Sequence, residues 1–268
     1  MDERPASLAT EPHVVLTIEG AIATITNNKP AKHNAFDDAM DARLFEILAE
    51  LRTQPQVRAV VWRGEGPSFS SGRDVGSIGT LRTELSHHEL MRRGHRGIQQ
   101  LWELDAPVIV ACKGATMGGS FQRALLCDMR IAAESTRFRL PELTHGVIPD
   151  TGGIAVLYQM AGPGVVTDLV LSGRAMDAAE ALRHGVVSRV VPDAELDGAV
   201  YEIAEQIASR PAVSVKLARL LVANLARPQL RASMGDEMIY QTFLNRSDDF
   251  AEFRAARNES RDPRYTGS

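Results

Sequence analysis

The stretch PVIVACKGATMGGSFQRALLCD, Pro107 to Asp128, passes from an apolar β-branched run through two adjacent glycines into a helical pattern. A short apolar run that ends in glycine is typical of a buried strand, which we predict within 106–114. A similar run occupies 57–64, and a helical pattern around 84–103 separates the two. Strands that alternate with helices favour parallel strands joined by crossovers, so this stretch indicates an α/β fold.

The flanks of this stretch extend the pattern. Upstream, HVVLTIEGAIATITN alternates apolar and polar residues on both sides of Glu19 and Gly20, which predicts a β-hairpin, and 37–53 has the spacing of an amphipathic helix. We expect one structural unit, with an α/β core over 1–200 and a helical C-terminal region over 201–268. Helical patterns dominate the second half, apart from a short strand predicted at 185–192, and they occupy 152–160, 163–171, 177–184, 193–208, 211–225 and 230–256.

The 268 residues have the composition of a soluble globular protein, with 44% hydrophobic and 24% charged residues. A net charge of −4 gives no electrostatic reason to expect a nucleic-acid partner. The polar N-terminus has no apolar run typical of a signal peptide, and we expect the other apolar runs to be too short to cross a bilayer. Cys112 and Cys127 lie in apolar surroundings, which favours buried free thiols. These features predict a cytoplasmic protein with no membrane partner.

Two glycine-containing turns, Gly64–Ile78 and Lys113–Asp128, follow the two predicted central strands. Small residues let a ligand approach the backbone closely, and N–H groups at a helix start favour a developing negative charge. One donor from each turn would make an oxyanion hole. The alternative is that the glycines serve only tight strand-to-helix turns. The spacing matches neither a phosphate-binding loop nor a nucleophile elbow.

The segment LPELTHGVIPDTGG, Leu140–Gly153, has carboxylates on either side of a histidine. A glycine and a proline argue against a continuous helix, so Glu142 and Asp150 are expected on a loop. Apolar neighbours would desolvate these carboxylates and raise their pKa values, which suits proton transfer near neutral pH. Capping of the following helix is an alternative role for Asp150. A packing or surface role is favoured for His145, which has no partner at metal-ligand spacing.

Five segments, taken in order, resemble the crotonase (enoyl-CoA hydratase/isomerase) superfamily, and the resemblance covers nearly the whole chain. They are NNKPAKHNAF, GPSFSSGRDV, PVIVACKGATMGGSFQRALLCDMRIAAEST, FRLPELTHGVIPDTGG and LSGRAMDAAEALRHGVVSRVVP. The resemblance implies an α/β spiral of ββα units whose helical C-terminal extension builds a homotrimer or a hexamer. It also implies an acyl-CoA thioester as substrate, with coenzyme A as part of that substrate and no metal or separate cofactor.

The resemblance also implies roles for individual positions. The backbone N–H groups of Arg73 and Gly119 would hold the thioester oxygen and stabilise an enolate. Relatives usually have a small residue at the position of Arg73, and its side chain has two possible directions, toward the CoA phosphates or away from them. Contacts with CoA are implied for the following residues: Lys32, Ala35, Ser71, Asp74 and Val75.

The second carboxylate position departs from the hydratases of the family, which use two glutamates. One of them matches Glu142, but the other falls at Gln122, an amide that cannot exchange a proton. Asp150 stands where most relatives have glycine. It resembles an aspartate of the dienoyl-CoA isomerases and also the nucleophilic aspartate of 4-chlorobenzoyl-CoA dehalogenase.

We therefore expect an enzyme that isomerises the double bond of an enoyl-CoA, with Glu142 as the base. Asp150 would be a second acid or base or would tune Glu142, and Gln122 would orient substrate or water. The alternatives are hydration by Glu142 and Asp150, hydrolysis or dehalogenation with Asp150 as nucleophile, and a CoA-binding trimer without catalysis. The identity of the acyl group depends on the loop around 76–100.

Overall fold

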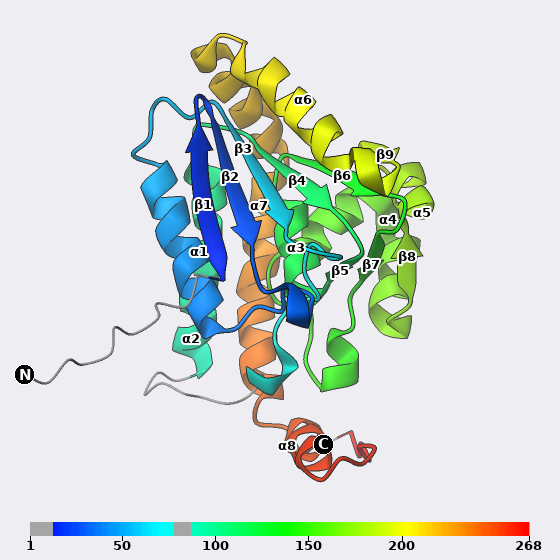
Figure 1. Cartoon of the computed structure of the whole chain (residues 1–268). Helices are drawn as coiled ribbons and strands as arrows, with labels where there is room; N and C mark the ends of the chain where they lie inside the picture. Colours follow the sequence, from blue (N-terminus) through cyan, green and yellow to red (C-terminus); the bar gives the residue numbers. More distant parts are fainter. Residues whose placement is uncertain (1–12, 78–86, 268) are drawn as a thin grey trace, which may run out of the picture.

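A computed structural model describes residues 13–77 and 87–267, and its main element is a six-stranded sheet (Figure 1). The first two strands form the predicted antiparallel hairpin, and every later neighbouring pair is parallel. Crossover connections between these parallel strands confirm the α/β class. In spatial order the strands are β1 (Val14–Glu19), β2 (Ile22–Asn27), β3 (Ala59–Gly64), β4 (Val108–Cys112), β6 (Met129–Ala133) and β9 (Arg189–Val191).

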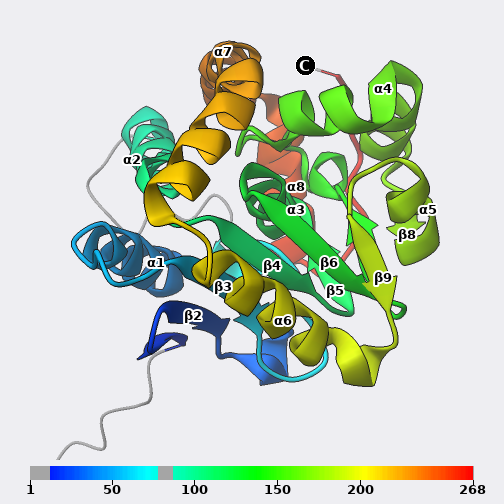
Figure 2. The same cartoon turned by 90° about the horizontal axis from the view of Figure 1, so that it is seen from above.

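Helices cover both faces of this sheet, because side chains of a strand point alternately to its two faces (Figure 2). In β3, Val60 and Trp62 belong to the larger core beneath α1, α3 and α4, whereas Ala59 and Val61 pack against α6. The helices are α1 (Asp38–Leu51), α2 (His87–Gln99), α3 (Gly118–Leu126), α4 (Gly153–Ser172), α5 (Ala178–Arg183), α6 (Leu196–Ala208), α7 (Ala212–Leu244) and α8 (Asp248–Asn258). Short 3-10 turns are η1 (Pro30–Lys32), η2 (Val75–Ser77), η3 (Gln100–Glu103), η4 (Glu142–His145) and η5 (Asp193–Glu195).

A second sheet has strands of only three residues each and was not expected from the sequence. It consists of β5 (Ala115–Met117), β7 (Arg137–Arg139) and β8 (Ala175–Asp177). Three residues are too few to establish an alternating pattern, so tertiary pairing decides these strands. This small sheet begins where the glycine turn of Lys113–Asp128 leaves β4, and it therefore sets the start of α3.

The break predicted between 225 and 230 is wrong, because α7 continues through Pro228. A proline inside a helix loses one backbone hydrogen bond, and packing on both sides compensates for this loss here. Before Pro228, Arg219 bonds to Asp128 at 2.7 Å; after it, Leu230 and Met234 are buried. The predicted helix over 230–256 is in turn divided, since the Ser247 side chain caps a new helix, α8, by accepting from the Phe250 N–H.

Helix α4 corrects the expectation that every apolar run is too short to cross a bilayer. Among the helices that the structure describes, α4 is long and apolar enough by length and composition, with a mean hydropathy of 1.5. It contacts α3 and α7, and its backbone is broken at Gly162, which precedes Pro163. Leu157 and Leu169 lie in the core, but only 22% of this apolar stretch is buried, so we interpret α4 as a helix that packs one side against the core.

Candidate active site

The two glycine turns lie side by side because their backbones pair. The Ser70 N–H donates to the Ala115 carbonyl at 3.0 Å, and the Met117 N–H donates to the Ser70 carbonyl at 3.0 Å. Between them, Gly72 has a φ of +94°, and a Cβ there would lie 2.8 Å from the Met117 carbonyl oxygen. Only glycine fits such a close approach with that backbone conformation.

This pairing places both predicted oxyanion donors on one cavity of about 230 Å³. Arg73 lies just after Gly72, and Gly119 is the second residue of α3, where N–H groups have no acceptor within the helix. The cavity is also lined by the following predicted site residues: Ser71, Val75, Glu142 and Asp150.

Glu142 enters the cavity from η4 and is only 8% exposed. Its Oε1 accepts a hydrogen bond of 2.8 Å from the Gln122 side chain, whereas its buried Oε2 has no hydrogen-bond partner among the residues that the structure describes. Burial raises the pKa of Glu142 to about 7, and the nearby charge of Asp150 acts in the same direction. Glu142 therefore has one free oxygen and a pKa suited to proton transfer near neutral pH.

Gln122 lies behind Glu142, fully buried, and its side-chain amide is occupied at both ends. Besides donating to Glu142, it accepts from the Thr151 N–H at 2.9 Å and from the Gly153 N–H at 3.3 Å. The structure places Gln122 outside the lining of the cavity, and the expectation that it orients substrate or water stays a prediction. Gln122 joins Glu142 to the loop that carries Asp150.

Asp150 does not cap α4, because the cap position is Gly152 and the side chain that accepts from the Gly152 N–H is that of Glu237. It lines the cavity instead, on a loop whose carbonyl at Asp150 lies 2.6 Å from the ring nitrogen Nε2 of His95. Burial raises the pKa of Asp150, against the opposing charges of His95, Arg123 and Arg73. A partly desolvated carboxyl group therefore shares the cavity with Glu142.

The residues of the site that were not singled out from the sequence include His95, Arg123, Glu237 and Gln241. The Glu237 carboxylate accepts from the Gly152 N–H at 2.8 Å, and the Gln241 side chain accepts from the Ile148 N–H at 3.1 Å. Both belong to α7 and are at most 5% exposed. The sequence contains a pattern that could have identified Glu237 and Gln241 as buried, because they continue the helical spacing of the buried apolar residues Leu230 and Met234.

The Arg73 side chain points toward α1. It forms an ion pair with Asp41 at 2.7 Å and another with Asp38. Burial by itself would lower the pKa of Arg73, but the two carboxylates outweigh burial and raise it. This pairing decides the direction of the side chain that the sequence left open.

The five residues implied for CoA contacts come together along two paired segments. The Ser71 N–H donates to the His33 carbonyl at 2.8 Å, and the Asp74 N–H donates to the Phe36 carbonyl at 2.7 Å. Lys32, whose side chain is 61% exposed, lies 3.2 Å from the Asp74 carboxylate. Of the five residues, Ser71 and Val75 line the cavity, whereas Lys32, Ala35 and Asp74 lie on the paired segments without lining it.

His145 packs against the ring of Phe253 at 5.7 Å, as the packing interpretation requires, and it also lines the cavity. Burial lowers its pKa, and the charges of Arg257 and Arg139 add to this effect. Within residues 13–77 and 87–267, no group of three or more His, Cys, Asp or Glu side chains could hold a metal ion.

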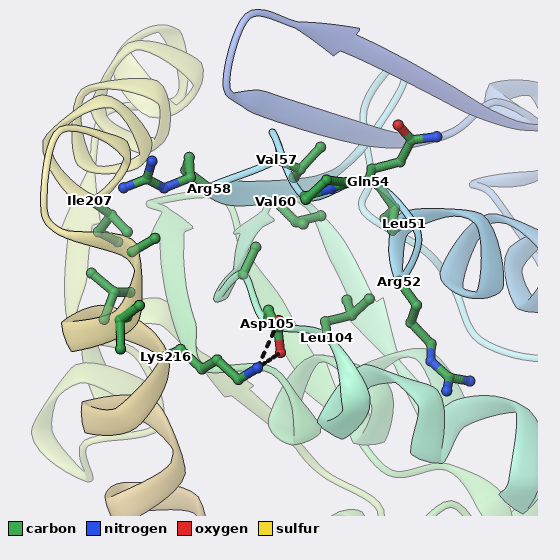
Figure 3. Close-up of a pocket in the computed structure, with 15 residues that line it drawn as sticks. Leu51, Arg52, Gln54, Val57, Arg58, Val60, Leu104, Asp105, Ile207 and Lys216 are labelled. Carbon is green, nitrogen blue, oxygen red and sulfur yellow. Dashed lines mark hydrogen bonds and ion pairs between the residues drawn. The ribbon is translucent and has the colours of Figure 1, made fainter.

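A second cavity of about 250 Å³ lies between the start of β3 and the first turn of α7 (Figure 3). Its cations are already paired: Lys216 with Asp105 at 2.8 Å, and Arg52 with Glu103 at 2.8 Å. Arg58 donates to a backbone carbonyl at 2.6 Å. None of the predicted site residues lines this cavity.

Comparison with known proteins identifies the family of this chain. The family model described as enoyl-CoA hydratase/isomerase matches residues 17–268. The chain belongs to this crotonase superfamily. A carnitinyl-CoA dehydratase of Escherichia coli O157:H7 is 33% identical over 258 residues, which cover 94% of this chain and 97% of the relative.

Solved structures of the superfamily share the fold. An enoyl-CoA hydratase/isomerase from Pseudoalteromonas atlantica T6c is 30% identical, with a TM-score of 0.86 and coverage of 95% of this chain and 100% of that one. An enoyl-CoA hydratase/carnithine racemase from Magnetospirillum magneticum is 30% identical, with a TM-score of 0.75 and coverage of 96% of both chains. The chain is therefore an enzyme of the enoyl-CoA hydratase/isomerase family, and an acyl-CoA thioester fits it as substrate.

Proposed function

We propose that this enzyme reversibly dehydrates a 3-hydroxyacyl-CoA to the enoyl-CoA. Glu142 removes the proton from the carbon next to the thioester. The bond between the β-carbon and its hydroxyl then breaks, and the hydroxyl leaves as water with the proton of Asp150. Hydration of the enoyl-CoA is the same path in reverse, with each carboxyl group in the opposite protonation state.

The observation that carries this proposal is the placement of the two carboxyl groups. Glu142 and Asp150 line one cavity, while the amide of Gln122 donates to Glu142 and accepts from the loop that carries Asp150. Asp150 therefore takes the role that a second glutamate has in the hydratases. The sequence favoured isomerisation, but the similarity to a relative named carnitinyl-CoA dehydratase supports dehydration.

The backbone N–H groups of Arg73 and Gly119 would stabilise the enolate that forms when Glu142 takes its proton. Preorganised donors of this kind commonly contribute about 10²–10³-fold each to turnover. Coenzyme A would lie along the two segments that contain Lys32, Ala35, Ser71, Asp74 and Val75. The exposed Lys32 ammonium suits a phosphate group there, since its charge reaches solvent.

Double-bond isomerisation is the second candidate, because the same carboxyl pair can serve it. Glu142 would remove a proton from one carbon, and the protonated form of Asp150, favoured by its raised pKa, would return one to another carbon. No water is gained or lost in that reaction. The mass of the thioester therefore separates the two candidates.

We also propose that the chain assembles as a homotrimer through α7 and its neighbours. Exposed apolar side chains lie along this helix, including Leu225 at 84% exposed and Phe243 at 75% exposed. Apolar patches of this kind usually mark an interaction surface in a soluble protein. Sedimentation of the purified protein tests the assembly, and Leu225→Glu should shift a trimer toward the monomer.

The test of the activity is incubation with crotonyl-CoA and, separately, with 3-hydroxybutyryl-CoA, followed by mass spectrometry of the thioesters. We expect interconversion by gain or loss of one water, and none with Glu142→Gln. The variant Lys216→Met changes a charged residue in the other cavity and serves as the matched control. Isomerised product with unchanged mass would replace dehydration by the second candidate.

A further inference from the structure

Two arginine side chains line the cavity beside the carboxyl pair, and they differ in how many carboxylate partners their guanidinium groups have. Arg73 has two carboxylate partners, Asp38 and Asp41. Arg123 stands four residues after Gly119 on α3, and residues at this spacing lie on the same face of a helix. Arg123 is therefore one turn beyond the proposed position of the thioester oxygen.

The Arg123 guanidinium is buried with unused donors. Its side chain is 11% exposed and lies 4.9 Å over the ring of Phe36. Its Nη1 lies 2.8 Å from Asp41, but Asp41 is shared with Arg73, and Nε and Nη1 of Arg123 lack a hydrogen-bond partner in the described part of the chain. Buried guanidinium donors require an acceptor, since leaving them unpaired is costly. Nε and Nη1 themselves have almost no accessible surface, so an occupant of the cavity would reach the guanidinium at the part of it that lines the cavity.

We propose that the acyl chain of the substrate ends in a carboxylate and that Arg123 binds this group. The proposal rests on the proposed function, because it takes the acyl-CoA thioester as given and specifies its far end. A carboxylate supplies two acceptor oxygens to a planar guanidinium fork, which neither an alkyl chain nor a hydroxyl does. An acyl group with a quaternary ammonium would instead place a cation next to Arg123 and Arg73.

Substitution of Asp41 provides a second test of this proposal. Asp41 occupies the side of Arg123 that faces α1 and competes with any anionic ligand for the same guanidinium. Replacing Asp41 should make Arg123 bind anions more tightly. If the Arg123–Asp41 pair were purely structural, substitution of either residue would weaken the binding of all ligands to the same extent. The two variants therefore have opposite expected effects under the proposal.

The experiment is equilibrium binding of two saturated thioesters, glutaryl-CoA and butyryl-CoA, which contain neither a double bond nor a 3-hydroxyl group. We expect the wild-type enzyme to bind glutaryl-CoA about tenfold or more tightly than butyryl-CoA, the range of a charge-assisted hydrogen bond. Arg123→Met should remove this preference and leave butyryl-CoA affinity unchanged. Asp41→Asn should increase the preference, and Arg52→Met, in the other cavity, should leave it as it is.

Equal affinity of the wild-type enzyme for both thioesters would overturn the proposal, as would a preference that survives Arg123→Met. If that variant does not fold, Arg123→Gln replaces it, keeping hydrogen-bond donors without the charge, and most of the preference should again disappear. Failure of the proposed function looks different. In that case crotonyl-CoA is not hydrated, whichever saturated thioester binds better.

Discussion

The two cavities of this enzyme are similar in volume, about 230 and about 250 Å³, but differ in how their polar groups are satisfied. In the cavity of Figure 3, Lys216 has a carboxylate partner and Arg58 has a carbonyl. In the other, one oxygen of Glu142 and Nε of Arg123 are buried without a partner in the described residues. Charged walls alone therefore do not identify a site. Buried groups without a hydrogen-bond partner distinguish the cavity of Glu142 from that of Figure 3, because a folded protein rarely leaves such groups unpaired.

The largest effect is expected from Glu142→Gln, which keeps the shape and the hydrogen bond from Gln122 but removes the base. Turnover should fall about a thousandfold or more, within the range of general base catalysis. Steady-state kinetics with crotonyl-CoA measures it, and binding of butyryl-CoA should be retained. Near-normal turnover would remove Glu142 from the mechanism.

A smaller loss, about a hundredfold, is expected from Asp150→Asn, because the amide cannot protonate the departing hydroxyl. The KM should change little, since Asp150 acts on the hydroxyl that leaves. A variant with unchanged kcat would return Asp150 to a structural role and favour a mechanism with Glu142 alone.

The rate should also depend on pH through Glu142. Its pKa of about 7 means that the ionised base is lost as pH falls below this value. Exchange of the proton next to the thioester depends on this base and requires no addition of water. We expect kcat/KM for this exchange to fall about tenfold per pH unit below 7. Proton exchange of butyryl-CoA in deuterated water measures it. A profile that stays flat down to pH 5 would contradict a neutral-range base.

The pH dependence of stability offers a weaker contrast, at Glu237. Burial raises the pKa of Glu237 to about 7, whereas hydrogen bonds from Ser233 and from the Gly152 N–H oppose this shift. A carboxyl group with a raised pKa in the folded state binds more protons there than in the unfolded state. Its contribution to stability is therefore lost as pH rises from the usual value near 4.5 toward 7. Glu237→Gln should reduce the loss of unfolding free energy between pH 5 and pH 8, measured by urea titration. An identical loss in the variant would show that Glu237 ionises normally.

The smallest effect is expected from Lys216→Met in the second cavity. Its ion pair with Asp105 is partly exposed, with side chains 45% and 70% accessible, so its removal should cost less than about 1 kcal/mol of unfolding free energy. Turnover should not change. A clear loss of activity would show that the two cavities are coupled and would end the distinction between them.

The sequence by itself determined the hairpin, the α/β class, the family and the two carboxyl candidates. Hydrophobic periodicity is local, so the hairpin, α1 and the parallel strands followed from it. The glycine turns and the position of Glu142 followed from motifs in which chemistry requires certain residues at certain spacings. The length of α7 did not follow, because local rules end a helix near Pro228, whereas contacts of α7 with distant segments maintain it.

Only the tertiary structure decided how the candidates are held. The bond from the Gly152 N–H to Glu237 joins residues 85 apart in the chain, and that from the Ile148 N–H to Gln241 joins residues 93 apart. No local pattern specifies such partners. The sequence identified Gln122 as an anomaly, but its role as a link between Glu142 and the Asp150 loop depends on where α3, η4 and α4 meet. Placement of buried polar groups is a property of packing, and packing brings together residues that the sequence keeps apart.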